Sequence, residues 1–148
     1  MINRTDLEQY IIEPALREIS MFSKNAVHLL SMTAALESDL GFHLKQVNGP
    51  ALGIYQMEPD THDDVWDSVL AFNANKLNRV MGSGCAFSEA KRMIYDLKYA
   101  TIMARVLYSR FKEVIPDLYE TKDMINYYLE YWKWLKKQKK LLRAIVHL

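Results

Sequence analysis

Apolar residues recur along this chain at the three- and four-residue spacing of α-helices, and alternating runs typical of strands are nearly absent. Glycine and proline are scarce and cluster in a few places, so the pattern predicts a mainly α-helical fold with one glycine-rich excursion. The first helical segment is predicted to start at Thr5, where Glu8 completes a capping box. Pro14 falls inside the pattern and either kinks the helix or splits it, and we favour a split into a short helix and a second one ending near Met21.

The next predicted helix, 24–38, is apolar on most of its sides, with Ser23 as its N-cap. Its apolar positions are Val27, Leu30, Met32, Ala34 and Leu36. A helix of this kind belongs in the centre of a domain, so Glu37 is expected next to the core. Desolvation there raises the pKa of a carboxyl group, as an acid catalyst working near neutral pH requires. The alternative is an exposed glutamate at a fraying helix end.

The segment from Asp39 to Asp60 is rich in turn residues and returns Gln56 towards Glu37. Gly53 allows a close backbone approach or a positive φ angle. A new helix is predicted to begin at Thr61. One carboxylic acid at a helix end, facing a glycine-rich loop that carries a glutamine, suits acid catalysis better than a structural role.

Two motifs here carry a family resemblance. Glu37 and Ser38 form an E-S pair at the end of a buried helix, and the run from Gly53 to Thr61 reads G-I-Y-Q-M-E-P-D-T, which fits G-x-x-Q-x-x-P-x-T. This combination resembles the lytic transglycosylase and goose-type lysozyme superfamily, and its residue sequence looks most similar to that of small phage-encoded members. A weaker similarity covers residues 99–110, which resemble the helix lining the back of the family's cleft.

The resemblance implies a mainly α, lysozyme-like single domain over residues 1–148. It places a short β-hairpin, around Gly49-Pro50, or a glycine-rich loop beside the catalytic helix. Glu37 is the implied catalytic acid. The implied substrate-binding residues are Ser38, Gly53, Tyr55, Gln56 and Tyr99. Gln56 offers a donor and an acceptor to a sugar amide or hydroxyl. A core role is the alternative for Tyr55 and Tyr99, and also for Phe42, Met57 and Tyr108.

No metal and no cofactor are predicted. The run from His62 to Asp64 invites a metal interpretation, but acidic residues in a first helical turn complement the helix dipole. His43, in the loop, is a further residue within reach of a substrate.

Further helices are expected over 63–71, with Trp66, Val69 and Leu70 buried, and over 75–81. A long helical region is predicted from Ser88 to Lys112, interrupted near Asp96. A last helix is predicted from Thr121 or Lys122 to near the end of the chain.

The last helix departs from the family pattern. Members usually place a Y-N motif here, whose tyrosine points at the catalytic glutamate. This chain has the letters reversed at Asn126-Tyr127, and Tyr131 is a geometric alternative to which the role is not transferred. A basic run then follows without an acid among its members, Lys133, Lys136, Lys137, Lys139, Lys140 and Arg143. We interpret it as a solvated basic face that is attracted to the anionic cell wall, and not as a specific nucleic-acid site.

Composition adds limits to this picture. The 148 residues suit one domain, and 19 basic against 18 acidic residues leave a net charge of +1, which does not indicate nucleic acid. The single cysteine, Cys85, excludes an internal disulfide framework. The polar N-terminus lacks the apolar core of a signal peptide, and no apolar run reaches the ~20 residues of a membrane span. We therefore expect synthesis in a host cytoplasm, delivery by other phage proteins, and action on the cell wall as an endolysin or a virion-associated enzyme.

The resemblance thus implies a glycosidase that degrades peptidoglycan by cleaving the β-1,4 bond between N-acetylmuramic acid and N-acetylglucosamine. No second acid stands out, because Glu58, Asp60, Asp63 and Asp64 are explained mainly as helix caps. This favours a lytic transglycosylase, in which the 6-hydroxyl of the sugar attacks and no carboxylate is needed to activate water. The alternatives are a goose-type lysozyme, which is a hydrolase, and a non-enzymatic helical module that binds nucleic acid or builds a virion.

Overall fold

The structure is a computed structural model that describes residues 1–86 and 89–133. Helices account for most of these residues, and no β-sheet forms among them. In chain order the helical elements are α1 (Arg4–Asp6), η1 (Leu7–Ile12), α2 (Glu13–Glu18), α3 (Lys24–Ser38), α4 (Pro59–Asp64), η2 (Val65–Leu70), α5 (Ala74–Gly82), α6 (Arg92–Tyr95), α7 (Leu97–Tyr108), α8 (Thr121–Tyr127) and η3 (Tyr128–Lys133), where η marks a π-helical turn. The mainly α prediction is confirmed.

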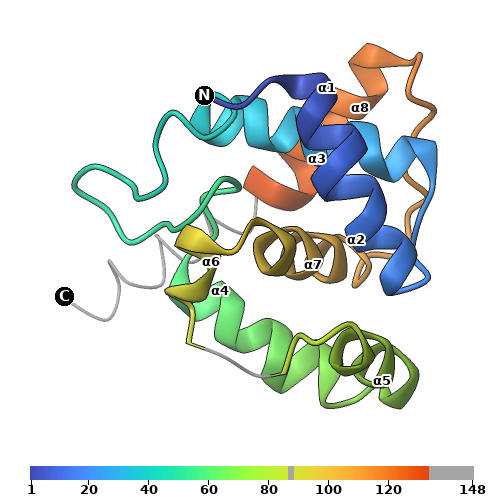
Figure 1. Cartoon of the computed structure of the whole chain (residues 1–148). Helices are drawn as coiled ribbons and strands as arrows, with labels where there is room; N and C mark the ends of the chain where they lie inside the picture. The colour runs from blue at the N-terminus through green and yellow to red at the C-terminus, as the bar shows by residue number, and fades with distance from the viewer. Residues whose placement is uncertain (87–88, 134–148) are drawn as a thin grey trace, which may run out of the picture.

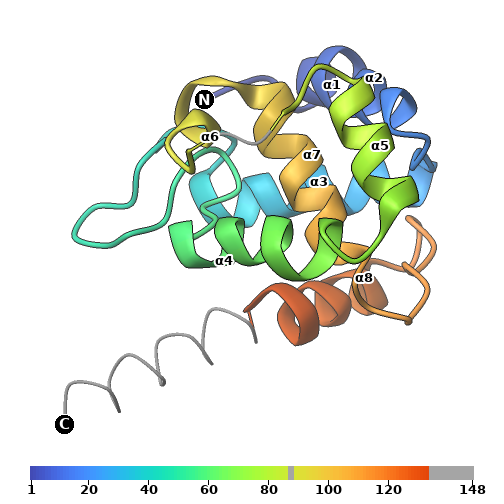
Figure 2. The ribbon, with the colours of Figure 1, turned by 90° about the horizontal axis from the view of Figure 1, so that it is seen from below.

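Helices α3 and α7 pack against each other in the middle of the molecule (Figures 1 and 2). Helix α7 also contacts η1, α2 and η2, and it is buried along nearly its whole length, from Tyr99 to Tyr108. Helix α3 buries Leu29, Leu30 and Ala34 against η1 and α7. Because η1 packs on both helices of this pair, α3 is held in the interior of the fold.

The first helical segment differs from its prediction. It begins at Arg4, because the Asn3 side chain accepts a hydrogen bond from the Asp6 N–H and caps it. Pro14 does not split the segment. The π-helical turn η1 lies directly before it, and the Glu13 N–H donates to the Glu8 carbonyl five residues back. This wider turn relieves the clash that a proline ring makes with the preceding helical turn.

Two other helix starts test the capping signals. Helix α3 begins after Ser23, whose hydroxyl accepts from the Ala26 N–H at 3.0 Å, as predicted. Helix α4 begins at Pro59 and not at Thr61. Proline is suited to the first helical position because its missing N–H would have no partner there. The predicted inward residues of the following turn, Trp66 among them, are buried.

The C-terminal half follows the prediction in part, since the helical region predicted up to Lys112 begins at Arg92 among the described residues and ends at Tyr108. Asp96 interrupts the helical region, and its carboxylate caps α7 by accepting from the Tyr99 N–H at 2.9 Å. Helix α8 begins at Thr121. The predicted start at Ser88 and the basic run from Lys136 to Arg143 lie outside the described residues.

The loop between α3 and α4 extends to one side of the helices (Figure 1). It contains two isolated antiparallel bridges, Lys45 with Leu52 and Leu52 with Met57, in place of a hairpin with strands. The glycine-rich loop, the other form expected beside α3, describes it better. Among the described residues no helix has both the length and the apolar character needed to cross a membrane.

Candidate active site around Glu37

Glu37 lies in the last turn of α3, which ends at Ser38 because Asp39 adopts a left-handed conformation with φ of 51°. Its side chain is only 2% exposed, although the backbone of the residue is partly accessible. The same carboxylate oxygen, Oε2, accepts a hydrogen bond from the Tyr128 hydroxyl and lies 2.9 Å from the Lys133 ammonium. Both partners belong to η3, so the end of the described chain closes over the end of the central helix.

A cavity of about 260 Å³ opens beside this carboxylate. Its lining residues are Leu36, Glu37, His43, Gln46, Val47, Gln56 and Lys133. The cavity therefore brings together Glu37 and Gln56, the pair predicted to face each other, and adds His43 from the loop. Among the described lining residues, Glu37 alone carries a carboxylate. The acids near it in the sequence are not in this lining, and Asp64 is paired with Arg110.

The tight turn from Gly53 to Gln56 sets the glutamine in place. The Gln56 backbone N–H and its side-chain Nε2 both donate to the Gly53 carbonyl, at 3.0 and 2.9 Å. Gln56 is 5% exposed and has a φ of 53°, a backbone conformation that is uncommon for residues other than glycine. Its Oε1 makes no hydrogen bond to a described residue, and Gln56 is part of the cavity lining.

Gly53 is required by close packing as well as by its φ of 78°. A Cβ atom at this position would lie 2.3 Å from the carbonyl oxygen of Met93 in α6. Gly53 therefore allows the turn to pack against α6 and is not part of the cavity lining.

Ser38 also lies beneath the cavity. Its hydroxyl donates to the Ile54 carbonyl at 2.6 Å and accepts from the Gly41 N–H at 2.9 Å. These bonds join the end of α3 to both sides of the loop. Ser38 is 2% exposed and absent from the lining, so the structure gives it a positioning role in place of the predicted sugar contact.

The two predicted tyrosines lie in the core, as their alternative interpretation had it. The Tyr55 hydroxyl pairs with Thr101 Oγ1 at 2.8 Å, and burial raises the pKa of this phenol. The Tyr99 hydroxyl bonds to His62 Nε2 at 2.7 Å and accepts from Trp66 Nε1 at 3.0 Å. Neither tyrosine lines the cavity beside Glu37.

The tyrosine that donates a hydrogen bond to Glu37 is Tyr128, which the sequence analysis did not single out. Tyr127 instead donates to the Glu113 carbonyl at 3.0 Å, and Tyr131 packs on the rings of Phe111 and Tyr127. A signal was available, because Met124, Tyr128 and Trp132 recur at four-residue spacing and are all buried. Burial, and then the hydrogen bond to Glu37, raise the pKa of the Tyr128 phenol, so it remains a donor at neutral pH.

The chemistry that this arrangement allows is proton transfer by a single enclosed carboxylate. Within residues 1–86 and 89–133, no cluster of three or more histidine, cysteine, aspartate or glutamate side chains could hold a metal ion. Comparisons of this chain with protein-family models, with curated proteins and with solved structures found no match.

Proposed function

We propose that this protein is a phage-encoded, lysozyme-like lytic transglycosylase that cleaves the β-1,4 bond between N-acetylmuramic acid and N-acetylglucosamine in peptidoglycan. The observation that carries the proposal is the enclosed carboxylate of Glu37 at the edge of a cavity, with Gln56 in the same lining. The motif resemblance around these two residues supplies the substrate class.

In the first step Glu37 gives a proton to the leaving glycosidic oxygen and becomes a carboxylate. The Tyr128 hydroxyl, already directed at Oε2, stabilises the charge that forms. Donors of this kind cost no reorganisation when they are in place before the reaction.

Lys133 opposes this step, because an ammonium 2.9 Å from Oε2 favours the charged carboxylate over the protonated acid. Its side chain is 48% exposed and flexible, so a glycan strand that enters the cavity can displace it into solvent. The bound sugar then excludes water, and exclusion of water favours the neutral carboxyl group. Substrate binding and activation of the acid are thereby coupled.

In the second step C1 of the muramic acid has oxocarbenium character, and a nucleophile must reach it. No other carboxylate among the described lining residues is available to activate water. The 6-hydroxyl of the same sugar is the nucleophile instead, and Glu37 takes its proton. An intramolecular attack of this kind has an advantage of effective concentration that water lacks.

Lysis of purified Gram-negative sacculi, followed by turbidity, tests the role of Glu37. Glu37→Gln should lower the rate at least ~100-fold, the usual contribution of a general acid, with an unchanged circular dichroism spectrum. Glu13→Gln is a matched control, since Glu13 forms only a surface pair with Arg17 and should leave lysis unaffected. Equal lysis by the Glu37 variant and the wild type would remove Glu37 from the mechanism.

Mass spectrometry of the digested sacculi separates the two enzymatic alternatives. A transglycosylase leaves 1,6-anhydro-N-acetylmuramic acid ends, each one water lighter than the reducing ends that a goose-type hydrolase leaves. Purely reducing ends would reject the internal attack. Absence of any lysis by the wild-type protein would favour a non-enzymatic helical module.

A further inference from the structure

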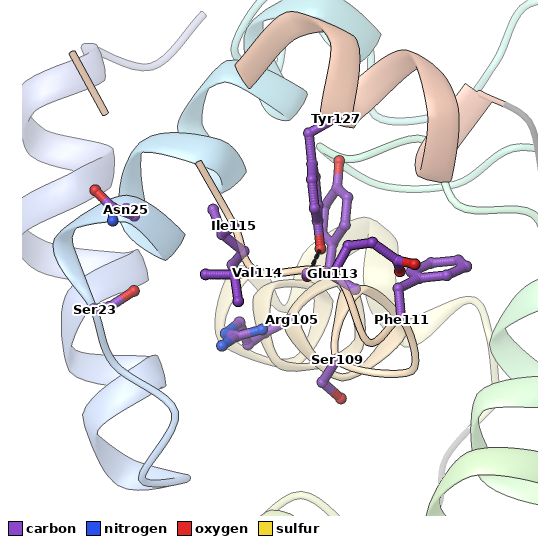
Figure 3. Close-up of a pocket in the computed structure, with 10 residues that line it drawn as sticks. Ser23, Asn25, Arg105, Ser109, Phe111, Glu113, Val114, Ile115 and Tyr127 are labelled. Carbon is purple, nitrogen blue, oxygen red and sulfur yellow. Dashed lines mark hydrogen bonds between the residues drawn. The ribbon is translucent and has the colours of Figure 1, made fainter. Parts of the chain in front are cut away.

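A second and larger cavity, of about 410 Å³, lies at the start of α3 (Figure 3). Its lining comes from the start of α3, the end of α7, the segment that follows α7 and the end of α8. The lining residues are Ser23, Asn25, Arg105, Tyr108, Ser109, Phe111, Glu113, Val114, Ile115 and Tyr127. The twelve-residue separation between Asn25 and Glu37 corresponds to about 18 Å along the helix, so this cavity is separate from the candidate active site.

Arg105 lines this cavity, and Lys76 lies outside the lining, bonded to Ser109. Arg105 donates from Nε to the Met21 carbonyl at 3.1 Å, and Lys76 donates to the carbonyl and hydroxyl of Ser109 at 3.3 and 2.9 Å. Neither forms an ion pair with a carboxylate of the residues described. Burial lowers the pKa of Arg105, and burial followed by the Arg105 charge lowers the pKa of Lys76. Partial burial of two like charges is unfavourable unless an anion accompanies them.

Neutral donors face the same space. The Asn25 Oδ1 accepts from the Leu118 N–H at 3.0 Å, which fixes the amide and leaves its Nδ2 hydrogens for the cavity. The Ser23 hydroxyl oxygen accepts from the Ala26 N–H, which leaves the hydroxyl hydrogen to donate. Figure 3 shows the Arg105 guanidinium directed towards the side of the cavity that carries Ser23 and Asn25.

The one acid among the described lining residues does not neutralise these groups. Glu113 is exposed, and Figure 3 shows its side chain extended towards Phe111 and away from the Arg105 guanidinium. Val114 and Ile115 supply apolar surface near the cations. The volume is in the range of small-molecule pockets and exceeds what a bare ion fills.

We propose that this cavity binds a small organic oxyanion, a carboxylate or a phosphate monoester, whose charged end pairs with the Arg105 guanidinium and whose apolar part lies on Val114 and Ile115. The planar guanidinium presents parallel N–H donors that match two oxygens of either group. Lys76 adds attraction from behind Ser109, and Asn25 and Ser23 donate from the facing wall. The site is independent of the proposed glycosidase activity.

Titration of the ¹⁵N-labelled full chain, followed by two-dimensional NMR, tests this inference. The carboxylate probe is N-acetylalanine, the phosphate monoester probe is glycerol 3-phosphate, and both are matched in ionic strength with sodium chloride. N-acetylalanine amide is the uncharged control. Saturable shifts of the amides of Ser23, Asn25 and Ser109 with either anion, absent with chloride and with the amide, are the expected result. The probe that binds identifies which of the two oxyanions the cavity prefers.

Substitutions then assign the charge. Arg105→Gln should weaken binding roughly ten-fold or more, the usual effect of losing a charge-assisted hydrogen bond, and Arg105→Lys should lie between the two. Lys76→Gln should weaken it less, and Lys112→Gln, which changes an exposed lysine outside the lining, should not alter it. If Arg105→Gln fails to fold, the comparison of probe binding by Lys76→Gln and Lys112→Gln still tests the proposal. Shifts that do not saturate, that follow chloride equally or that cluster around Glu37 would overturn the assignment.

Discussion

Replacement of Tyr128 by phenylalanine isolates the contact between the last helix and Glu37. The phenyl ring keeps the buried volume, since Tyr128 is 2% exposed and packs in the core cluster, so the change removes only the hydroxyl. That hydroxyl donates to a carboxylate, and hydrogen bonds to charged groups contribute ~1.5–3 kcal/mol. Glu37 keeps Lys133 and gains access to water from the cavity, so we expect Tyr128→Phe to lower the free energy of unfolding by about 1–2 kcal/mol.

A double-mutant cycle shows whether that loss comes from the carboxylate. With Glu37→Gln in place, the Tyr128 hydroxyl meets a neutral amide oxygen, and its removal should cost only ~0.5–1 kcal/mol. The coupling between the two positions should therefore be about 1 kcal/mol. Urea unfolding of the four proteins at neutral pH measures it, and an unchanged denaturant slope would show that the denatured state is not altered.

Tyr127→Phe is the matched control, because Tyr127 is the preceding residue and donates to a backbone carbonyl, that of Glu113. It should show no coupling to Glu37→Gln. A coupling for Tyr128 as small as that of Tyr127 would refute the assignment of Tyr128 to the carboxylate. If the proposed activity holds, Tyr128→Phe should also slow lysis roughly ten-fold, which corresponds to ~1.4 kcal/mol of lost stabilisation of the carboxylate formed in the first step.

Three further perturbations follow from the geometry. Gly53→Ala forces a side chain into a left-handed backbone against a carbonyl oxygen, and should lower the free energy of unfolding, measured in urea, by at least ~2 kcal/mol. The raised pKa values of Tyr55 and Tyr108 keep both phenols protonated in the folded chain when unfolded tyrosines ionise near pH ~10. The pKa values of Tyr128 and Tyr127 are raised as well. Stability is therefore retained below that pH and should fall above it by at least ~2.7 kcal/mol per pH unit, the contribution of Tyr55 and Tyr108 alone, as urea midpoints at alkaline pH would show. Lys133→Met removes the cation that favours charged Glu37, so the alkaline limb of the lysis rate against pH should move to higher pH.

Local signals predicted the part of the site that lies close together in the sequence. The cap at Ser23 and the apolar faces of helix 24–38 act within one helix, so the central helix was predicted with its observed bounds. Although Gly53 also packs against the distant Met93 carbonyl, the pairing of Gln56 with Glu37 was indicated by the turn residues between them and by the motif resemblance. Their meeting in one cavity was therefore within reach of sequence interpretation.

Contacts between segments that are far apart in the sequence could not be predicted in this way. Tyr128 and Glu37 are separated by 91 positions, and no spacing rule joins them. The tyrosines that resemblance suggested for substrate binding, Tyr55 and Tyr99, bury both ring and hydroxyl, because partners on other helices satisfy those hydroxyls. The expected break at Pro14 was wrong, because a π-helical turn before the proline accommodates its ring and the helix continues.

Tyr128 and Lys133, both partners of Glu37, differ in a way that bears on what the site does. A glutamate kept only for structure needs partners that stay, because an enclosed carboxylate without them is costly. Tyr128 is such a partner, buried and fixed by the core around it. Lys133 is not, since almost half of its side chain is exposed, it borders the cavity, and exposed ion pairs contribute little to stability. A fixed neutral donor combined with a displaceable cation leaves Glu37 able to change its protonation state without unfolding the end of α3, which is what a general acid must do.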